Sequence, residues 1–168
     1  MWYVIQVRSG TEEKIKGQCL KVIDRKILEQ CFVPYYEEKR KYQGSWHIEK
    51  RILFPGYVFM VSERLTDLSK NLHNVIGMTK LLGTGKEVVP LTEEEVNLLK
   101  RMGVGEKPVE LSMGIIENGT VMIIDGPLAG MEGCIRKVDR HKRKACLQIE
   151  MFGRTIEMEA GLEIIKKT

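Results

Sequence analysis

The chain has few of the residues from which metal sites and disulfide frameworks are built. Its 168 residues include four cysteines and three histidines, and these form no CxxC pair and no recognisable zinc-ligand spacing. We therefore expect buried thiols, no metal and no cofactor, although a disulfide across a hairpin between the last two cysteines stays an alternative. The cysteines are Cys19, Cys31, Cys134 and Cys146.

Long apolar runs and catalytic motifs are also missing. No apolar stretch approaches the roughly 20 residues of a membrane span, and Met1 leads directly into the strand-like segment WYVIQV rather than into a signal peptide. The sequence contains no G-x-S-x-G, P-loop or GxGxxG motif, and its serines and threonines fall mostly at turns and caps. We expect a monomeric, cytoplasmic protein that has no catalytic residues and binds no membrane.

Strand and helix patterns alternate in the first hundred residues. WYVIQVRSG is typical of a strand, and Thr11 is placed to cap a helix whose apolar face is Ile15, Cys19, Val22 and Ile23. Aromatic and β-branched segments on either side of residues 43–45 predict a hairpin and a further strand. Two more helices are predicted, at residues 65–75 and from Thr92 to Gly103. Residues 1–103 should therefore form an α+β domain, an antiparallel sheet with flanking helices.

The pattern changes after residue 103. Residues 104–113 are rich in glycine, proline and charge without periodicity, which indicates a linker. Residues 114–168 contain five strand-like segments: VMIID, EGCIRKV, ACLQIEM, RTIEME and LEIIKK. Gly126-Pro127, Phe152-Gly153 and Ala160-Gly161 mark predicted turns between them. Five short strands in this length predict a small β-barrel as the second domain.

A strongly basic turn is predicted between the second and third of these strands. The basic turn, residues 136–144 (RKVDRHKRK), holds six Lys or Arg and one Asp, whereas the whole chain has a net charge of only +4. Such a run is either a solvated hairpin tip or a site for an anionic partner. Its cations could neutralise phosphates, and arginine forks could bond guanine edges in an opened RNA groove. The candidate RNA-binding residues are Arg136, Lys137, Arg140, His141, Lys142, Arg143 and Lys144, with His141 expected to be a bystander.

Several motifs, taken in order, resemble the NusG family of transcription elongation factors from end to end. They are WYVIQVRSG, FPGYVFM, IIDGPLAGMEG, and FGR with the closing acidic and apolar strand. The resemblance implies an NGN domain at residues 1–103 and a KOW domain, an SH3-like barrel, at residues 114–168. Within the family, LLGTG and the basic residues after CIRKVD are most similar to the specialised antiterminator LoaP. Housekeeping members are implied to carry mixed charge at the same turn.

The resemblance also implies contact residues in the first domain. Matching aromatics of the family form an apolar cavity that receives the clamp helices of the largest RNA polymerase subunit. This carries over to Trp2, Phe54, Pro55 and Tyr57, for which an ordinary place in the core is the alternative. A weaker hypothesis places the non-template DNA strand against the first domain, where a plain helix end explains the pattern equally well. The residues of that hypothesis are Arg8, Lys14, His73 and Asn74.

Two functions follow from the sequence. In the first, the protein holds RNA polymerase with its first domain and a nascent RNA hairpin with its KOW domain, which promotes readthrough of terminators. In the second, the KOW domain is an adaptor for a ribosomal protein or a termination factor. Binding of an RNA hairpin by the second domain above a salt-sensitive background distinguishes the two.

Overall fold

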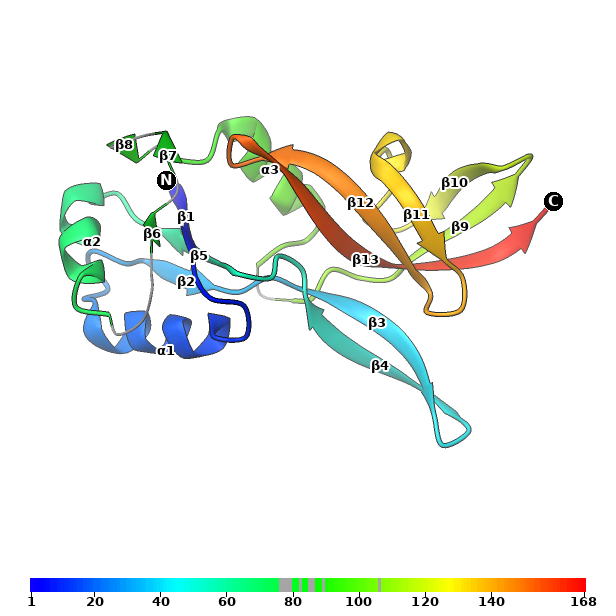
Figure 1. Ribbon diagram of the computed structural model, residues 1–168, viewed down its shortest axis with the longest axis horizontal. Helices are drawn as coiled ribbons and strands as arrows, with labels where there is room; N and C mark the ends of the chain where they lie inside the picture. The colour runs from blue at the N-terminus through cyan, green and yellow to red at the C-terminus, as the bar shows by residue number, and fades with distance from the viewer. Residues whose placement is uncertain (76–79, 82, 85–86, 89, 106) are drawn as a thin grey trace. The chain divides into compact units, whose positions relative to one another are not determined.

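The structure is a computed structural model that describes residues 1–75, 80–81, 83–84, 87–88, 90–105 and 107–168. These residues fold into two compact units, and each unit is made of two segments that are separated in the sequence (Figure 1). The first unit comprises residues 1–34 and 54–97, and the second comprises residues 35–53 and 98–168. The domain boundaries at 103 and 114 stay predictions. Among the described residues, no helix is long and apolar enough to cross a membrane.

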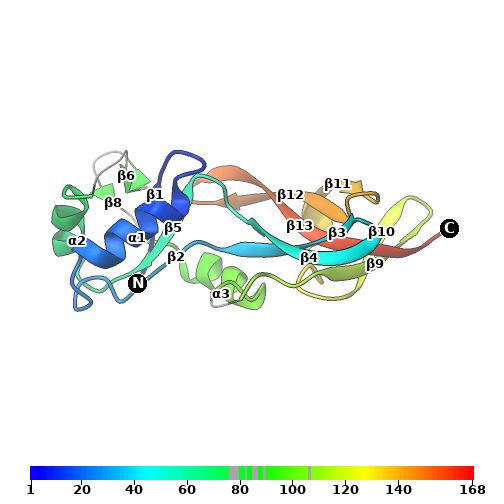
Figure 2. The ribbon, with the colours of Figure 1, turned by 90° about the horizontal axis from the view of Figure 1, so that it is seen from below.

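The first unit is built on a four-stranded sheet in the order β2-β5-β1-β6. Its neighbours pair antiparallel, and the strands are β1 (Trp2–Gln6), β2 (Gln30–Phe32), β5 (Tyr57–Val61) and β6 (Lys80–Leu81). Helix α1 (Glu12–Val22) packs against this sheet, as Figures 1 and 2 show, and α2 (Leu65–Leu72) follows β5. The short strands β7 (Gly83–Thr84) and β8 (Glu87–Val88) form a separate pair. The predicted mixed α+β architecture is confirmed.

The structure confirms the predicted cap of one helix and differs from the prediction for another helix at two residues. Helix α3 (Glu93–Arg101) begins as predicted, since the Glu95 N–H donates to the Thr92 hydroxyl at 3.1 Å. Thr11 occupies the position before α1, but its hydroxyl donates to the Arg8 carbonyl at 2.6 Å instead of capping the helix. Val22, predicted on the apolar face of α1, is exposed, because Ile15, Cys19 and Ile23, spaced four residues apart, form the buried side of the helix.

The second unit contains a five-stranded sheet in the order β10-β9-β13-β12-β11. Its elements are β9 (Ser112–Glu117), β10 (Thr120–Asp125), a short 3-10 helix (Glu132–Cys134), β11 (Ile135–Asp139), β12 (Lys144–Met151) and β13 (Arg154–Lys167). The predicted inward alternation of β12 is confirmed, because Ala145, Leu147, Ile149 and Met151 are all buried. Whether this sheet is the KOW barrel stays a prediction.

One predicted turn in this unit is wrong. The turn predicted at Ala160-Gly161 is absent because β13 continues through it. Strand β9 begins at Ser112, within residues 104–113, whose assignment as a linker stays a prediction. The first half of β13 pairs with β12 and its second half pairs in parallel with β9, so one long strand serves both neighbours. The small residues Ala160 and Gly161 are buried at this change of partner rather than exposed in a loop.

The hairpin of β3 (Tyr35–Tyr42) and β4 (Ser45–Ile52) packs on β13 in the same unit. Val109 is hydrogen-bonded to the edge of β3, donating to the Tyr35 carbonyl at 2.7 Å and accepting from the Glu37 N–H at 2.8 Å. Gly161 allows this close approach, because a Cβ at that position would collide with the Glu37 carbonyl oxygen and the Leu111 side chain. The hairpin is therefore fitted to the sheet through its backbone.

The turn of the IIDGPLAG motif requires glycine at position 126. Gly126 has a φ of +111°, and a Cβ there would lie 2.6 Å from the Cα of Ser112, whose hydroxyl accepts the Leu128 N–H at 3.0 Å. We expect Gly126→Ala to lower the free energy of unfolding by about 2 kcal/mol or more, because backbone strain and a steric clash add. Urea denaturation measures the change. Gly133→Ala is the control, since its Cβ would meet nothing within 4 Å, and equal losses would contradict the assignment.

Candidate functional site

Two of the four predicted polymerase contacts, Trp2 and Tyr57, lie on one face of the four-stranded sheet, although not as a single cluster. Trp2 pairs with Val61 and Gln6 pairs with Tyr57, so Trp2 and Tyr57 point to the same side from opposite ends of the β1–β5 pair. Four residues of strand separate these ends, which is about 13 Å. Both side chains are half-buried. The two residues therefore mark the ends of an apolar face.

Phe32 fills the space beside Trp2, and sequence reasoning missed it. The Trp2 and Phe32 rings meet edge to face at 5.3 Å, and Phe32 stacks on Phe59 at 5.5 Å. Phe32 is half-buried, whereas Phe59 is fully buried beneath it. The only sequence signal was an apolar residue in the short strand before Pro34, which does not reveal the cross-strand neighbours. We call Trp2, Phe32 and Tyr57 the aromatic face.

Phe54 and Pro55 support this face rather than extend it. Phe54 is 0% exposed and packs against Phe59 at 5.5 Å, so its ring belongs to the core. Pro55 is exposed in the turn before β5, where the Tyr57 N–H donates to the Phe54 carbonyl at 3.2 Å. This turn sets the direction of Tyr57. A direct contact of Phe54 or Pro55 with polymerase stays a prediction.

The predicted DNA-contact residues occupy three separate segments. Arg8 follows β1, Lys14 lies in the first turn of α1, and His73 and Asn74 follow α2. All four are exposed. The LLGTG motif falls partly on positions 82 and 85, which lie outside the described residues. A DNA contact at these residues stays a prediction.

The basic turn covers most of β11, the hairpin tip at residues 140–143 and the first residue of β12, and its central residues are exposed. Lys137, Arg140, His141 and Lys142 all face solvent. The Asp139 carboxylate accepts the Lys142 backbone N–H at 3.0 Å, and this hydrogen bond holds the pKa of Asp139 below its ordinary value. The one acid in the run therefore shapes the turn, while four side chains of the run project outward.

The other three candidate residues of the basic turn have partners inside the unit. Arg136 donates to the Gln148 side chain at 3.2 Å and to the Gly133 carbonyl at 2.7 Å. Arg143 and Lys144 are half-buried and form ion pairs with two acids of β13, Glu163 at 3.6 Å and Glu159 at 2.9 Å. These cations hold the tip against the sheet. Contact of any of the seven residues with RNA stays a prediction.

The four cysteines are free thiols, and one of them contacts the surface beside the basic turn, because the Cys146 thiol donates to the Glu159 carboxylate at 3.9 Å. Cys19 and Cys31 are buried free thiols, as predicted, but Cys134 and Cys146 are only half-buried. The alternative of a disulfide between the latter two is wrong, because both thiols are free and Cys146 lies opposite Lys137 in the β11–β12 register. In the part of the chain that the structure describes, no group of three or more His, Cys, Asp or Glu could hold a metal ion.

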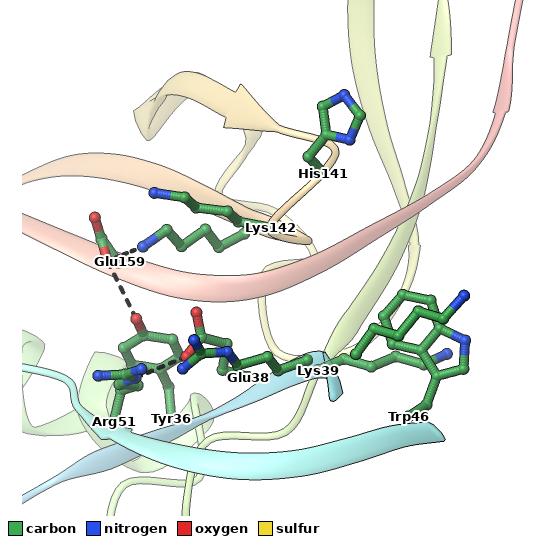
Figure 3. A pocket seen from close by; sticks show the side chains of 11 residues that line it. Tyr36, Glu38, Lys39, Trp46, Arg51, His141, Lys142 and Glu159 are labelled. Atoms are coloured by element: carbon green, nitrogen blue, oxygen red, sulfur yellow. Dashed lines mark hydrogen bonds and ion pairs between the residues drawn. The ribbon is translucent and has the colours of Figure 1, made fainter. Parts of the chain in front are cut away.

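Glu159 links the basic turn to the β3–β4 hairpin (Figure 3). Its carboxylate accepts from Lys144 Nζ at 2.9 Å and from the Tyr36 hydroxyl at 3.2 Å. The hydrogen bond from Lys144 holds the pKa of Glu159 below its ordinary value of 4.5, and burial raises the pKa of Tyr36 above its ordinary value of 10.0. The cluster therefore favours ionised Glu159 together with neutral Tyr36.

The stability of the second unit should consequently fall at acid pH through Glu159. Because its pKa is lower in the folded chain, its contribution is present above the ordinary value of 4.5 and is lost as the pH falls through the folded pKa. We expect the urea midpoint of the parent to fall more steeply than that of Glu159→Gln between about pH 5 and pH 3. Glu157→Gln, on the same strand, is the control. Parallel curves for the parent and Glu159→Gln would contradict this role.

Comparison with known proteins places the whole chain among transcription factors. Residues 1–100 match the sequence model of a family described as transcription termination factor nusG. The chain is 33% identical to the transcription termination/antitermination protein NusG of Bacillus subtilis strain 168, over 99% of this chain and 97% of that protein. The corresponding protein of Staphylococcus aureus strain Mu50 is 32% identical, over 99% and 94%.

A solved structure agrees with the fold. It is described as domain interaction in NusG of Thermotoga maritima, and it aligns with 95% of this chain and 92% of its own at a TM-score of 0.62 and 22% identity. An identity this low supports similarity of fold and nothing finer. The match to the family model and the identity to curated relatives along the whole chain carry the assignment. This chain belongs to the NusG family of transcription termination and antitermination proteins.

Proposed function

We propose that the protein is a specialised antitermination factor of the LoaP type. Its N-terminal NGN domain binds the clamp helices of RNA polymerase, and its C-terminal KOW domain binds a hairpin in the nascent RNA. The observation that carries the proposal is the basic turn, where Lys137 on β11 and Arg140 and Lys142 at the tip are exposed while the only acid of the run accepts a backbone hydrogen bond. The resemblance to the family implies that housekeeping members carry mixed charge at this turn, which supports the specialised function over the adaptor.

The charge and shape of the tip suit a structured RNA. Each cation that neutralises a phosphate releases condensed counterions, which gives affinity that falls steeply with salt. The major groove of a regular RNA helix is too narrow for side chains, so a projecting turn requires a bulge or loop that opens the groove. An arginine in the opened groove can donate two hydrogen bonds to guanine, which supplies discrimination between bases.

The aromatic face suits the polymerase contact. Trp2, Phe32 and Tyr57 present half-buried rings above the fully buried Phe54 and Phe59, which gives a rigid apolar surface. Aromatic residues in such settings supply a large share of the binding energy of protein interfaces. A helical tip with apolar side chains is the matching partner. The exposed residues Arg8, Lys14, His73 and Asn74 are proposed as an additional contact with non-template DNA.

The mechanism requires positioning and no covalent chemistry. Once the first domain holds polymerase, capture of the nascent hairpin becomes intramolecular, and a short connection gives an effective concentration of order millimolar. RNA binding then recruits the factor to particular transcripts. Polymerase binding keeps it in place while later terminators are transcribed.

Selection of RNAs by the purified full-length protein tests this function. We expect enrichment of hairpins with bulged or looped residues, and binding of the selected RNA that exceeds binding of an unstructured RNA of equal length at the same salt concentration. The matched control is the selected hairpin with its bulge deleted. Equal affinity for selected and unstructured RNA would refute the function proposed here and favour the protein-binding adaptor.

A further inference from the structure

The β3–β4 hairpin and the basic turn enclose a cavity of about 480 Å³ in the second unit (Figure 3). This volume falls within the roughly 300–1,000 Å³ that is typical of small-ligand clefts, so an unpaired nucleotide fits by size. One wall comes from the hairpin and the other from the turn and β13. The residues that matter below are Lys39, Arg40, Lys41 and Trp46 on the hairpin, and Lys142 and Lys144 on the turn.

The lining of this cavity is strongly cationic. Six cationic side chains and two carboxylates line it, which leaves a net charge of four positive with His141 neutral. Both carboxylates already have cationic partners, since Glu38 pairs with Arg51 at 2.7 Å and Glu159 pairs with Lys144 at 2.9 Å. Two of the lining cations also pair with acids outside the lining, Lys39 with Glu163 at 3.3 Å and Arg40 with Glu49 at 3.9 Å, but cations still outnumber acids in the lining itself. An anionic ligand would be favoured there.

Trp46 brings an aromatic surface to this cationic cavity. Its ring is contacted by the Arg143 guanidinium, whose Cζ lies 3.7 Å from the ring centroid, and by the ammonium groups of Lys39 and Lys41 at 5.5 and 5.8 Å. Trp46 nevertheless remains 45% exposed. An indole that served only to dock the hairpin would be expected to bury most of its ring. An exposed ring among cations is instead the combination with which proteins bind unpaired nucleotides.

We propose that the β3–β4 hairpin is the second half of the RNA site. Trp46 stacks with an unpaired base of the bound RNA next to Arg143, while Arg40 and Lys41 contact the flanking phosphates opposite Lys142. This inference rests on the function proposed above and adds residues that lie far from the basic turn in sequence.

Substitution of Trp46 tests the stacking contact. The probe is the labelled stem-loop of highest affinity from the selection with the parent protein. Trp46→Ala should weaken binding by roughly 5- to 150-fold, the range expected for loss of one stacking platform, and Trp46→Phe should restore most of the affinity. Tyr42→Ala is the matched control, because Tyr42 is an exposed aromatic of the same hairpin outside the cavity. Equal affinity of Trp46→Ala and Tyr42→Ala would overturn the proposal.

Fluorescence separates a direct contact from an indirect loss of structure. The chain has two tryptophans, so in Trp2→Phe the remaining emission reports Trp46 alone. Saturating RNA should quench that emission strongly because a stacked base adjoins the ring. In Trp46→Phe, the emission of Trp2 should be almost unchanged by the same RNA. No quenching in Trp2→Phe at saturation would overturn the stacking contact.

Salt dependence tests the phosphate contacts of the hairpin. Arg40→Gln with Lys41→Gln should lower the log–log salt slope of RNA binding by up to roughly one and a half to two. Lys166→Gln with Lys167→Gln removes the same charge from exposed positions of the same unit and should lower the slope much less. Equal slopes in the two double variants would overturn the hairpin contact and leave the basic turn as the RNA site. Failure of the parent to discriminate structured RNA would instead remove the proposed function itself.

Discussion

Replacement of Lys137, Arg140 and Lys142 together by glutamine is expected to lower the log–log salt slope of RNA binding by roughly two to three. These three exposed cations of the basic turn are proposed to neutralise phosphates. Each neutralised phosphate releases condensed counterions, and this release makes the salt slope steeper. Glutamine keeps the length and polarity of the side chains, so the fold should be preserved. The measurement is fluorescence anisotropy with the selected hairpin between about 50 and 200 mM salt.

The structure determines which cations belong in this test. Arg143 and Lys144 pair with Glu163 and Glu159, so their removal would leave acids of β13 without their partners and confuse loss of contact with loss of structure. The control replaces the exposed Lys107, Lys166 and Lys167 by glutamine and removes the same charge from the same unit. If the control triple lowered the slope as much as the turn triple, the basic turn would be no more than a solvated tip.

Trp2→Ala and Tyr57→Ala are each expected to weaken binding to RNA polymerase by about 30-fold or more, the effect of losing an interface hot spot. The two residues lie at opposite ends of the aromatic face, so each substitution alone should weaken polymerase binding. RNA affinity should stay at the parent value, because neither residue belongs to the unit that carries the basic turn. Binding is measured by biolayer interferometry against purified RNA polymerase.

Stability is controlled separately in the polymerase experiment. Trp2 packs edge-on against Phe32, so the urea midpoint of each variant is compared with that of the parent, and a variant that unfolds is excluded. Leu20→Ala is the matched apolar control, since Leu20 is 50% exposed on α1 in the same unit. Parent-like polymerase affinity in both aromatic variants would place the contact outside the aromatic face.

Local pattern was sufficient to predict some elements of this fold and not others. The alternation of β12 predicted its buried face, and Thr92 predicted the start of α3, because each signal depends on neighbouring residues alone. The turn predicted at Ala160-Gly161 was wrong, because small residues are typical both of turns and of places where two segments pack closely. Only the packing of the β3–β4 hairpin against β13 decides between them.

In the candidate sites, too, some features were predictable from local sequence and others depend on tertiary packing. The charge of the basic turn was evident from composition, but its separation into exposed and paired cations depends on Glu159 and Glu163 in a distant strand. Phe54 and Tyr57 belong to one motif, yet one is core and the other is half-exposed because the Pro55-Gly56 turn changes the chain direction between them. The contact of Trp46 with Arg143 joins two segments that lie far apart in the sequence and that no local pattern connects.

Reconstituted transcription tests the central claim most directly. Purified RNA polymerase transcribes a template with an intrinsic terminator, either with the selected RNA element encoded upstream or with that element scrambled. We predict that the parent protein raises readthrough only when the intact element is transcribed, and that the Lys137, Arg140 and Lys142 triple variant loses this effect while it still binds polymerase. Equal readthrough from the intact and scrambled templates, or full readthrough by the triple variant, would contradict recruitment through the basic turn.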